Sequence, residues 1–322
     1  MLAALYRRPG ASDVLTVEEV PEPQPGPGEV AVRLRVAGVN PTDWKTRGRK
    51  QPSSFQVPGQ DGAGDVVAVG EGVDRSRLGE RVWVWFAEAH GQWGTAAQVT
   101  VVPSRQAVPL PDAASYDLGA GLGIPAMTAW HCLFADGPLD GSTVLVAGGA
   151  GAVGNAAIAL AARGGARVVT TVGDDRSAEL ARAAGAHAVV DRRGADLAAR
   201  VRAEAPDGVD RVVEVALGAN LALDLAVLAP RGVVSTYADD PLRDVPVRDL
   251  MVANATLAFV LVYGVGDAAL DDAVRGVSEA VAVRALPPLP AVRFPLRDVA
   301  AAHDAVQSGV VRGKVVLDLP HQ

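Results

Sequence analysis

The spacing of apolar residues changes about a third of the way along the chain. Before that point, short runs of alternating apolar and polar residues stand between clusters of proline and glycine. Such a pattern is typical of an antiparallel β-domain, because each run is strand-length and each cluster favours a turn. The predicted strands are residues 30–37, 65–69, 81–86 and 96–102.

From about Gly123 onward, helical patterns alternate with short apolar runs. Regular alternation of this kind predicts a parallel sheet covered by helices on both faces. The final stretch, with a helix predicted at 296–308 and a strand at 314–319, returns to polar–apolar alternation and is expected to close back on the first domain. The strands predicted for the parallel sheet are residues 144–147, 168–171, 188–191, 211–215, 232–236 and 256–262.

A glycine-rich turn follows the first of these strands directly. It has the form Gly-x-Gly-x-x-Gly and opens into an alanine-rich helix predicted over residues 152–163. We expect Gly149 to allow the tight turn, Gly151 to let the backbone approach a pyrophosphate, and Gly154 to let the helix pack closely on the strand. A second apolar strand at 166–171 completes a βαβ unit, which is the setting that a dinucleotide-binding turn requires.

Composition narrows the class of protein further. The chain has 322 residues, 49% of them hydrophobic, which is enough for two well-filled domains. A single cysteine, Cys132, excludes an internal disulfide and predicts a reducing, cytoplasmic setting. The formal net charge of −7 comes without a basic block, and no run is long enough to span a membrane, so nucleic acid and membrane are not expected partners.

Several segments, taken in order, resemble the medium-chain dehydrogenase/reductase superfamily, and within it the zinc-independent quinone oxidoreductases, the branch that includes zeta-crystallin. The resemblance implies a β-rich, GroES-like catalytic domain at 1–122 and 288–322. It also implies a Rossmann domain, a doubly wound α/β sheet, at 123–287, and a cleft between the two that holds NAD(P)H. The segments that carry the resemblance are residues 37–45, 58–64, 123–130, the glycine turn at 148–154, and 313–318.

The residues of two of these segments argue against a catalytic metal. Zinc-dependent relatives carry a cysteine where this chain has Asn40, and a His-Glu pair where it has Gln60 and Asp61. Neutral amides are poor substitutes for the thiolate and imidazole that zinc prefers. The cysteine-rich loop of those relatives is also missing, so we expect no metal site.

Without a metal, the protein must place the acceptor and stabilise the negative charge that arises as hydride arrives. Quinones and α,β-unsaturated carbonyls are electrophilic enough for this, so they are the predicted substrates. Asn40 and Lys45 are the candidate orienting groups, with Asp43 beside them. An Asp-x-Lys arrangement resembles the enone and alkenal reductases of the branch; the alternatives are a solvated lysine and a helix cap.

The resemblance also transfers cofactor contacts to particular positions. Beyond the glycines, these are Ala152 and Val153 beside the pyrophosphate, Thr128, the main chain at Val262 and Tyr263, and Lys314 near the cleft.

The end of the second strand of the βαβ unit bears on which nicotinamide cofactor binds. An acid there would accept hydrogen bonds from the ribose and repel a 2′-phosphate, but the residue at that position is Val172. Guanidinium groups at Arg176, and at Arg192 or Arg193, could pair with a 2′-phosphate, which favours NADPH. Asp174 and Asp175 keep NADH open as the alternative.

The sequence thus predicts an NADPH-dependent reductase of quinones or enones, and leaves two alternatives. One is an enoyl reductase of a biosynthetic pathway, and the other is a cofactor-binding protein without useful turnover, as in some zeta-crystallin relatives. The apolar segment 256–262 is expected to form an exposed edge strand, which predicts a homodimer joined through that edge.

Overall fold

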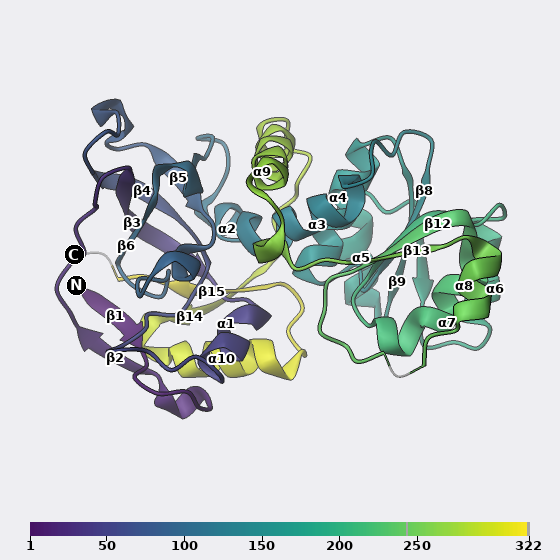
Figure 1. The fold of residues 1–322 in the computed structure, drawn as a ribbon, viewed down its shortest axis with the longest axis horizontal. Helices are drawn as coiled ribbons and strands as arrows, with labels where there is room; N and C mark the ends of the chain where they lie inside the picture. Colours follow the sequence, from purple (N-terminus) through teal and green to yellow (C-terminus); the bar gives the residue numbers. More distant parts are fainter. Residues whose placement is uncertain (243, 321–322) are drawn as a thin grey trace. The chain divides into compact units, whose positions relative to one another are not determined.

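The computed structural model describes residues 1–242 and 244–320, which fold into two compact units (Figure 1). The first unit joins the two ends of the chain, Met1–Ile124 and Pro288–Gln322, and the second is the continuous segment Pro125–Pro287. Among the described residues, none of the helices combines the length and the apolar character needed to cross a bilayer.

The first unit is built on a seven-stranded sheet with the order β14-β15-β3-β4-β5-β7, in which β6 pairs with β3. The long strand β3 (Glu29–Gly38) is central because it pairs with β4, β6 and β15, all antiparallel. Its inward residues Val30, Val32 and Leu34 are buried in the core. The other elements of this unit up to the domain crossing are β1 (Leu2–Leu5), β2 (Thr16–Glu19), α1 (Pro41–Arg47), β4 (Asp61–Val69), β5 (Arg81–Val84), β6 (Val99–Pro103), β7 (Ala107–Pro109) and α2 (Tyr116–Gly119).

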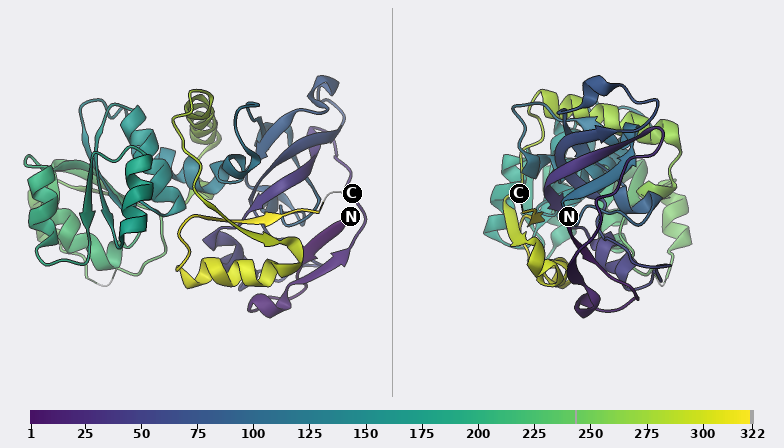
Figure 2. Two further views of the ribbon diagram at one scale, coloured as in Figure 1. Left: turned by 180° about the vertical axis from the view of Figure 1, so that it is seen from behind. Right: turned by 90° about the vertical axis from the view of Figure 1, so that its left-hand side faces the viewer.

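The last part of the chain completes this sheet with one parallel pair. Strands β14 (Ala291–Pro295) and β15 (Lys314–Asp318) run parallel, whereas the pairs of named strands within the first 120 residues are antiparallel, as predicted. A parallel pair needs a crossover, and helix α10 (Val299–Ser308) supplies it. The helix packs against both strands and against α1 (Figure 2). β15 in turn pairs with β3, which fixes Lys314 next to the end of β3.

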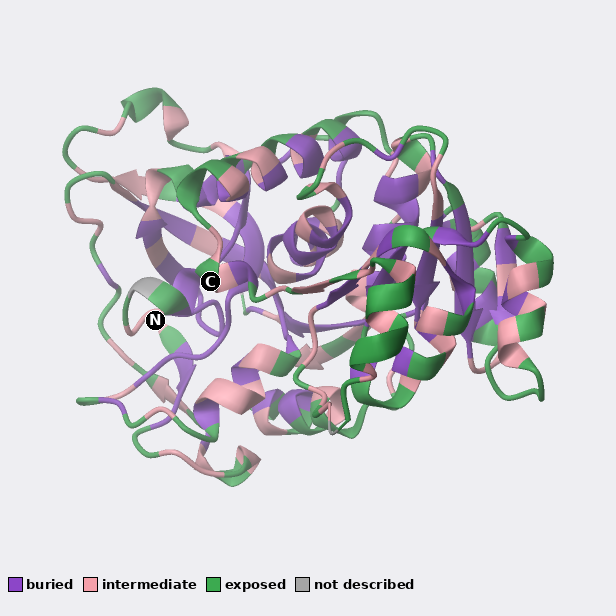
Figure 3. Cartoon of the chain, turned by 45° about the vertical axis from the view of Figure 1, so that its right-hand side comes forward, coloured by how far each residue is buried: buried purple, intermediate pink, exposed green. Residues whose placement is uncertain are grey.

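The second unit has a six-stranded sheet with the order β10-β9-β8-β11-β12-β13, and every pair in it is parallel. The strand order reverses direction at β8, as in a doubly wound Rossmann fold. In Figure 3 the strands are largely buried while the helices expose one side. The strands are β8 (Thr143–Ala147), β9 (Arg167–Val172), β10 (Ala188–Asp191), β11 (Val209–Glu214), β12 (Leu228–Thr236) and β13 (Thr256–Phe259).

Helices α4 to α8 lie in the connections between the strands, as the alternating pattern predicts, whereas α3 precedes β8 and α9 follows β13. The helix α4 has the predicted bounds, and the sequence misplaces mainly strand ends. Strand β13 ends at Phe259 and not at residue 262, because a turn closed by the Gly264 N–H and the Leu261 carbonyl follows it. The helices are α3 (Met127–Phe134), α4 (Ala152–Arg163), α5 (Asp175–Ala183), α6 (Leu197–Glu204), α7 (Leu217–Val227), α8 (Val247–Ala253) and α9 (Asp267–Ala282).

A pair of acids is buried where β11 meets α7. Glu214 and Asp224 are 0% and 1% exposed, respectively. Glu214 Oε1 accepts hydrogen bonds from the Ala216 N–H and from Asn220 Nδ2, so its carboxylate holds the start of α7. Burial, followed by the proximity of Glu214, raises the pKa of Asp224 to about 8. Asp224 therefore binds a proton in the folded protein at neutral pH.

Replacing this acid should remove a pH dependence of stability. The folded-state pKa of Asp224 lies above its ordinary value of 3.8, so the stability that its proton provides is complete below pH 4 and is lost as the pH rises through about 8. We expect Asp224→Asn to raise the melting temperature relative to the unmodified protein at pH 8.5, with a smaller gain at pH 5. Differential scanning calorimetry at both pH values measures this, and a gain independent of pH would contradict the assignment.

Candidate functional site

The turn between β8 and α4 is constrained by the backbone at one glycine and by packing at two others. Gly148 has a φ of +70°, so it is the left-handed residue of the turn. Gly149, which the sequence assigns to the tight turn, is constrained by space, since a Cβ there would lie 2.2 Å from Thr170 Oγ1. A Cβ at Gly154 would lie 2.5 Å from the Gly148 carbonyl oxygen, which is the close helix–strand approach that the sequence predicts.

Gly151 is placed differently from these three. It is exposed, it is the N-cap residue of α4, and the nearest atom to a Cβ there would be the Gly148 carbonyl oxygen at 3.5 Å. Nothing in the fold itself therefore demands glycine at 151. The free N–H groups of the first turn, from Ala152 and the half-buried Val153 onward, face the same end of the helix. This end of α4 offers an anion site open to a phosphate.

A buried asparagine behind the turn holds its shape. The Nδ2 of Asn155 donates to the Leu180 carbonyl at 3.1 Å and to the Gly149 carbonyl at 3.4 Å. Asn155 thereby links the glycine turn to helix α5. Sequence reasoning missed this residue, although a polar side chain in an otherwise alanine-rich helix is a signal for such a role.

One of the predicted arginines, Arg192, directly follows β10 and lies against the turn at the end of β9. A Cβ at Gly173 would lie 3.1 Å from Arg192 Nε, so the guanidinium covers this glycine. Arg176 instead pairs with Glu179 of its own helix at 2.8 Å. Arg193 pairs with Asp191 at 2.9 Å. Asp174, the alternative ribose partner, accepts the Ser177 N–H as the cap of α5.

The predicted nicotinamide contacts of this unit lie on α3 and the 3₁₀ helix Val262–Gly264, which pack against each other. Thr128 and Val262 are buried, and Tyr263 is half-buried. Trp130 fixes the position of α3 because its indole N–H donates to Asp272 of α9 at 2.7 Å. The structure therefore places Thr128 and Val262 on two elements in direct contact.

In the first unit, three residues from distant segments form one buried hydrogen-bonded cluster. Lys314 Nζ donates to Asn40 Oδ1 at 2.7 Å and to the Val39 carbonyl at 3.0 Å. Asn40 Nδ2 donates to Asp61 Oδ2 at 2.6 Å. Asp61 Oδ1 accepts the Ile124 N–H at 2.9 Å. We call Asn40, Asp61 and Lys314, with Asp43 behind Asn40, the buried polar cluster.

Glycines make room for these contacts. A Cβ at Gly123 would lie 2.1 Å from Asp61 Oδ1, and one at Gly38 would lie 3.0 Å from Lys314 Cε and 2.1 Å from the Ala120 carbonyl oxygen. Segments 37–45, 58–64, 123–130 and 313–318 therefore each contribute to the same buried site. Their order in the sequence does not show this meeting.

The structure separates the three predicted catalytic residues. Asp43 is 1% exposed and its Oδ2 accepts the Asn40 N–H at 2.7 Å, which makes it the reciprocal partner of Asn40 in a capping box at the start of α1. Asn40 belongs to the cluster through its side chain. Lys45 lies apart from the cluster: it is half-buried on the same helix, and its ammonium lies 5.8 Å from the centre of the Trp44 ring.

Burial governs the ionisation of the cluster. It raises the pKa of Asp61 to about 6, against the opposing effects of Lys314, the Ile124 N–H and Asn40. It also raises the pKa of Asp43 well above its usual value, and the nearby carboxylates of Glu88 and Asp61 add to this rise. For Lys314, burial lowers the pKa, while Asp61 and Asp43 hold it up. The site is therefore a low-dielectric environment in which each added charge is costly.

The donor set of this cluster does not suit a zinc ion. Both ends of the Asn40 amide are engaged, and an ammonium group lies against its oxygen, which disfavours a second cation at that place. Within residues 1–242 and 244–320, no group of three or more His, Cys, Asp or Glu side chains is arranged to hold a metal ion.

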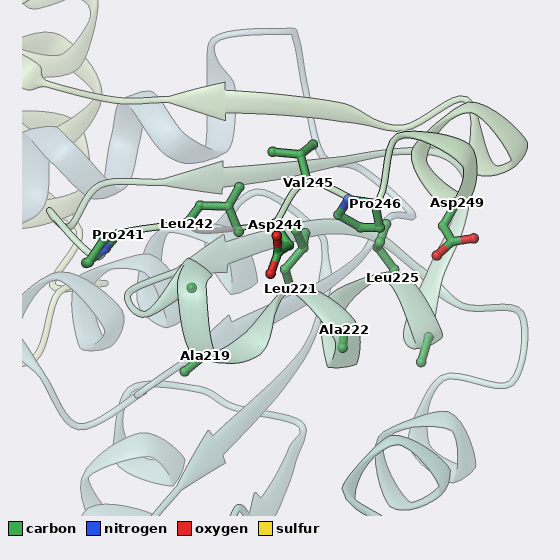
Figure 4. Close-up of a pocket in the computed structure, with 12 residues that line it drawn as sticks. Ala219, Leu221, Ala222, Leu225, Pro241, Leu242, Asp244, Val245, Pro246 and Asp249 are labelled. Atoms are coloured by element: carbon green, nitrogen blue, oxygen red, sulfur yellow. The ribbon is translucent and has the colours of Figure 1, made fainter.

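A groove of about 830 Å³ in the second unit lies between α7 and the segment around residues 241–249 (Figure 4). Its walls are mainly apolar and include Leu221, Leu225, Leu242 and Val245. Asp244 and Asp249 are its ionisable lining residues among the described part of the chain. This set of side chains offers no group for hydride-transfer chemistry.

Comparisons with known proteins agree with this geometry. Residues 26–112 match the family described as "Alcohol dehydrogenase GroES-like domain", and residues 152–279 match "Zinc-binding dehydrogenase". The quinone oxidoreductase of Rattus norvegicus is 28% identical over 315 residues, covering 96% of this chain and 94% of the relative.

Two further relatives are informative. A phenolphthiocerol/phthiocerol polyketide synthase of Mycobacterium tuberculosis is 32% identical over 97% of this chain, which spans only 14% of that protein. A mycobacterial protein solved as a complex with NADPH superposes with a TM-score of 0.85 at 29% identity, covering 98% of this chain and 99% of the other.

The two glycines of the turn make a matched pair for a test. We expect Gly154→Ala to lower the free energy of unfolding by about 1–3 kcal/mol, because the new methyl group must displace backbone at Gly148. Gly151→Ala should stay within about 0.5 kcal/mol of the unmodified protein, because its Cβ has room. Urea unfolding followed by circular dichroism measures both, and equal losses would contradict the packing account.

Proposed function

Because the chain belongs to the medium-chain dehydrogenase/reductase superfamily, in its zinc-independent quinone oxidoreductase branch, we propose that it is an NADPH-dependent reductase of quinones or α,β-unsaturated carbonyls. The observation that carries the proposal is the buried polar cluster. There Asn40, at the position that the resemblance matches to a cysteine of zinc-dependent relatives, is hydrogen-bonded to an ammonium group and to a carboxylate. An oxidoreductase with this donor set needs an acceptor that is already activated.

The glycine turn and its surroundings would hold the cofactor. Gly151 and Val153 at the start of α4 would bind the pyrophosphate, and Arg192 would pair with the 2′-phosphate. Thr128 and the main chain around Val262 would bind near the nicotinamide. When bound, the reduced nicotinamide supplies a hydride to the acceptor.

The buried polar cluster would then stabilise the charge that builds up on the acceptor oxygen. Lys314 Nζ has three hydrogens, of which two are engaged by the Val39 carbonyl and by Asn40. The positive charge is held in place by the Asn40 amide, which Asp61 orients. A fixed cation in a buried environment interacts strongly with a developing negative charge and needs no reorganisation during the reaction. A proton from water completes the reduction.

An enoyl reductase of a biosynthetic pathway is the second candidate. The resemblance to a polyketide synthase over nearly the whole chain favours it. Quinone reduction and enone reduction would both use the buried polar cluster. Lys45 is the residue whose substitution we expect to affect these two activities differently. A cofactor-binding role without turnover is the third candidate.

Turnover assays separate these candidates. NADPH and NADH oxidation should be followed by absorbance with a benzoquinone, a naphthoquinone, a short enone and an enoyl thioester, each with and without a chelator. We expect chelator-insensitive NADPH oxidation with a quinone or the enone. Preference for the thioester would favour the enoyl reductase, and tight NADPH binding without any turnover would favour the binding role.

The two neighbouring arginines after β10 test the cofactor preference. We expect Arg192→Ala to weaken NADPH binding about 10- to 100-fold through the loss of a charge-assisted contact, and to change NADH binding little. Arg193→Ala is the matched control, because that guanidinium is already paired with Asp191. Isothermal titration calorimetry gives both affinities. An equal loss for NADPH and NADH in Arg192→Ala would count against a 2′-phosphate contact.

We also propose that the protein forms a homodimer through β13, the last strand of its sheet. Large apolar side chains gather on and beside this edge: Met251, Val252, Phe259 and Leu261 are 64–70% exposed. Such an edge favours pairing with a second copy. Val260 is a poor site for a test, because its N–H already donates to the Thr236 carbonyl of β12 at 2.8 Å.

Phe259 is a sharper probe of this interface, since it is 70% exposed. We expect Phe259→Asp to yield a monomer, because a buried, unpaired carboxylate at the interface is costly. Val310→Asp, at a residue 73% exposed in the other unit, is the control and should leave the dimer intact. Light scattering at matched concentrations measures the mass, and a dimeric Phe259→Asp variant would rule out this edge.

A further inference from the structure

A third acid lies behind the buried polar cluster, and neither the sequence pattern nor the proposed chemistry accounts for it. Glu88 is 2% exposed, in the 3₁₀ helix Ala87–His90 that follows β5. The backbone enters this helix through Phe86, a non-glycine residue with a φ of +54°. A left-handed conformation at a bulky residue is strained, so the fold holds Glu88 in its inward position at some cost.

The contacts of Glu88 lead toward the cluster. Its Oε2 accepts the Gly59 N–H at 3.2 Å and Gln60 Nε2 at 3.5 Å, and Gln60 directly precedes Asp61. Within the described chain, Asp43 Oδ1 is buried without a hydrogen-bond partner, whereas the carboxyl group of Glu88 also interacts with the Tyr6 side chain. An acid without a partner for one oxygen is poorly compensated when ionised.

The ionisable groups around Glu88 come from several elements. Lys50 and Tyr6 act on it directly, and its own charge acts on Asp43 of α1 and on Tyr6. Arg47 of α1 faces Tyr6 and also His303 of α10. Burial raises the pKa of Glu88 to about 7, against the opposing effects of Lys50, the Gly59 N–H and Tyr6.

We propose that Glu88 is a positioning residue that sets the charge of the buried polar cluster, so that its ionisation suppresses hydride transfer at alkaline pH. This inference rests on the proposed function. Glu88 does not need to touch the acceptor; it acts through Asp43 and the Gln60–Asp61 segment.

The reason is a count of charges in a low-dielectric site. Lys314 acts on Asp43 and Asp61, and Lys50 acts on Glu88 from a half-buried position nearer the surface. If all three acids ionise, they outnumber these two ammonium groups, and an acceptor that gains a negative oxygen is repelled. If Glu88 and Asp43 keep their protons, Asp61 and Lys314 balance, and the new negative charge is tolerated. Glu88 and Asp43 interact, so their protons belong to the pair, and neutralising either member removes one charge at high pH.

The test compares Glu88→Gln with the unmodified protein from pH 6 to pH 9. Glutamine copies the protonated acid, so the ratio of kcat/KM, variant to unmodified, should be near one at pH 6. It should rise about tenfold by pH 8, where an acid with a pKa of about 7 is about nine-tenths ionised. Lys50 is half-buried near the surface, and its positive charge lowers the pKa of Glu88. Lys50→Gln removes that charge, so the pKa of Glu88 should rise. The fall of kcat/KM at alkaline pH should then begin at a higher pH than in the unmodified protein.

A second readout does not depend on turnover. The infrared carbonyl band of protonated carboxylic acids, recorded on the protein without cofactor at pH 6, should lose intensity in Glu88→Gln. Asp224→Asn is the matched control: it also removes a buried acid with a raised pKa, and so also reduces the band. Its kcat/KM ratio should stay constant with pH, because Asp224 belongs to the other unit.

The outcomes separate this inference from the proposed function. An unmodified protein that turns over no acceptor overturns the proposed function, and with it this role, whatever the infrared band shows. An active protein whose Glu88→Gln variant keeps the same pH profile, or loses activity equally at every pH, overturns the role of Glu88 alone. An infrared band unchanged in Glu88→Gln also overturns it, because Glu88 would then hold no proton at pH 6.

Discussion

The amide of Asn40 is the group on which the first unit depends. It accepts from the ammonium of Lys314 and donates to the carboxylate of Asp61, all within the buried interior. Removing one partner from a buried hydrogen-bonded charge leaves the other uncompensated, at a typical cost of about 3–5 kcal/mol. Sheet pairing of β15 with β3, the capping box of α1 and the space left by Gly123 all serve to bring these three groups together.

In the second unit, the main constraint is the space around the glycine turn, where neighbouring atoms leave no room for a Cβ at two positions. Its glycine turn is shaped by Thr170 and by the Gly148 carbonyl, and Asn155 ties it to α5. Gly151 has room for a side chain and yet presents bare backbone at the exposed start of α4. The fold therefore accounts for glycine at 149 and 154, and the proposed cofactor contact accounts for glycine at 151. Both units also bury acids with raised pKa values, Asp224 in one and Asp43 with Asp61 in the other.

The sequence predicts the parallel sheet of the second unit well, because hydrophobic periodicity and a glycine turn are local signals. The bounds of α4 are correct, and β9 is shifted by a residue or less at each end. Strand β13 is shorter than predicted because apolar composition continues past the turn at 261–264. The parallel pairing of β14 with β15 is not predicted, since strand direction depends on the crossover and not on the alternation of residues.

The site is less accessible to sequence reasoning than the fold. The segments that resemble the superfamily contain Asn40 and Lys314, but the direct hydrogen bond between them joins residues 274 positions apart. The sequence identifies Asp61 only as a replaced metal ligand and assigns no role to Glu88. An acid amid an apolar run is a signal for Glu88, but only the packing of the Gly59–Gln60 segment shows that it is buried. Lys45 differs from Glu88 in this respect. Its segment, 37–45, is one of those that resemble the superfamily, but its side chain lies by the Trp44 ring and apart from the cluster.

The measurement that tests the account most directly is isotope transfer. The protein would be treated with a chelator and given NADPH carrying deuterium at both C4 positions, together with a quinone and an enone in turn. For the enone, the account predicts one deuterium on carbon in the reduced product, at a rate that the chelator leaves unchanged. A product without deuterium, or a reaction that stops on chelation and returns with added zinc, would contradict metal-free hydride transfer from NADPH to an acceptor held at the Asn40–Asp61–Lys314 cluster.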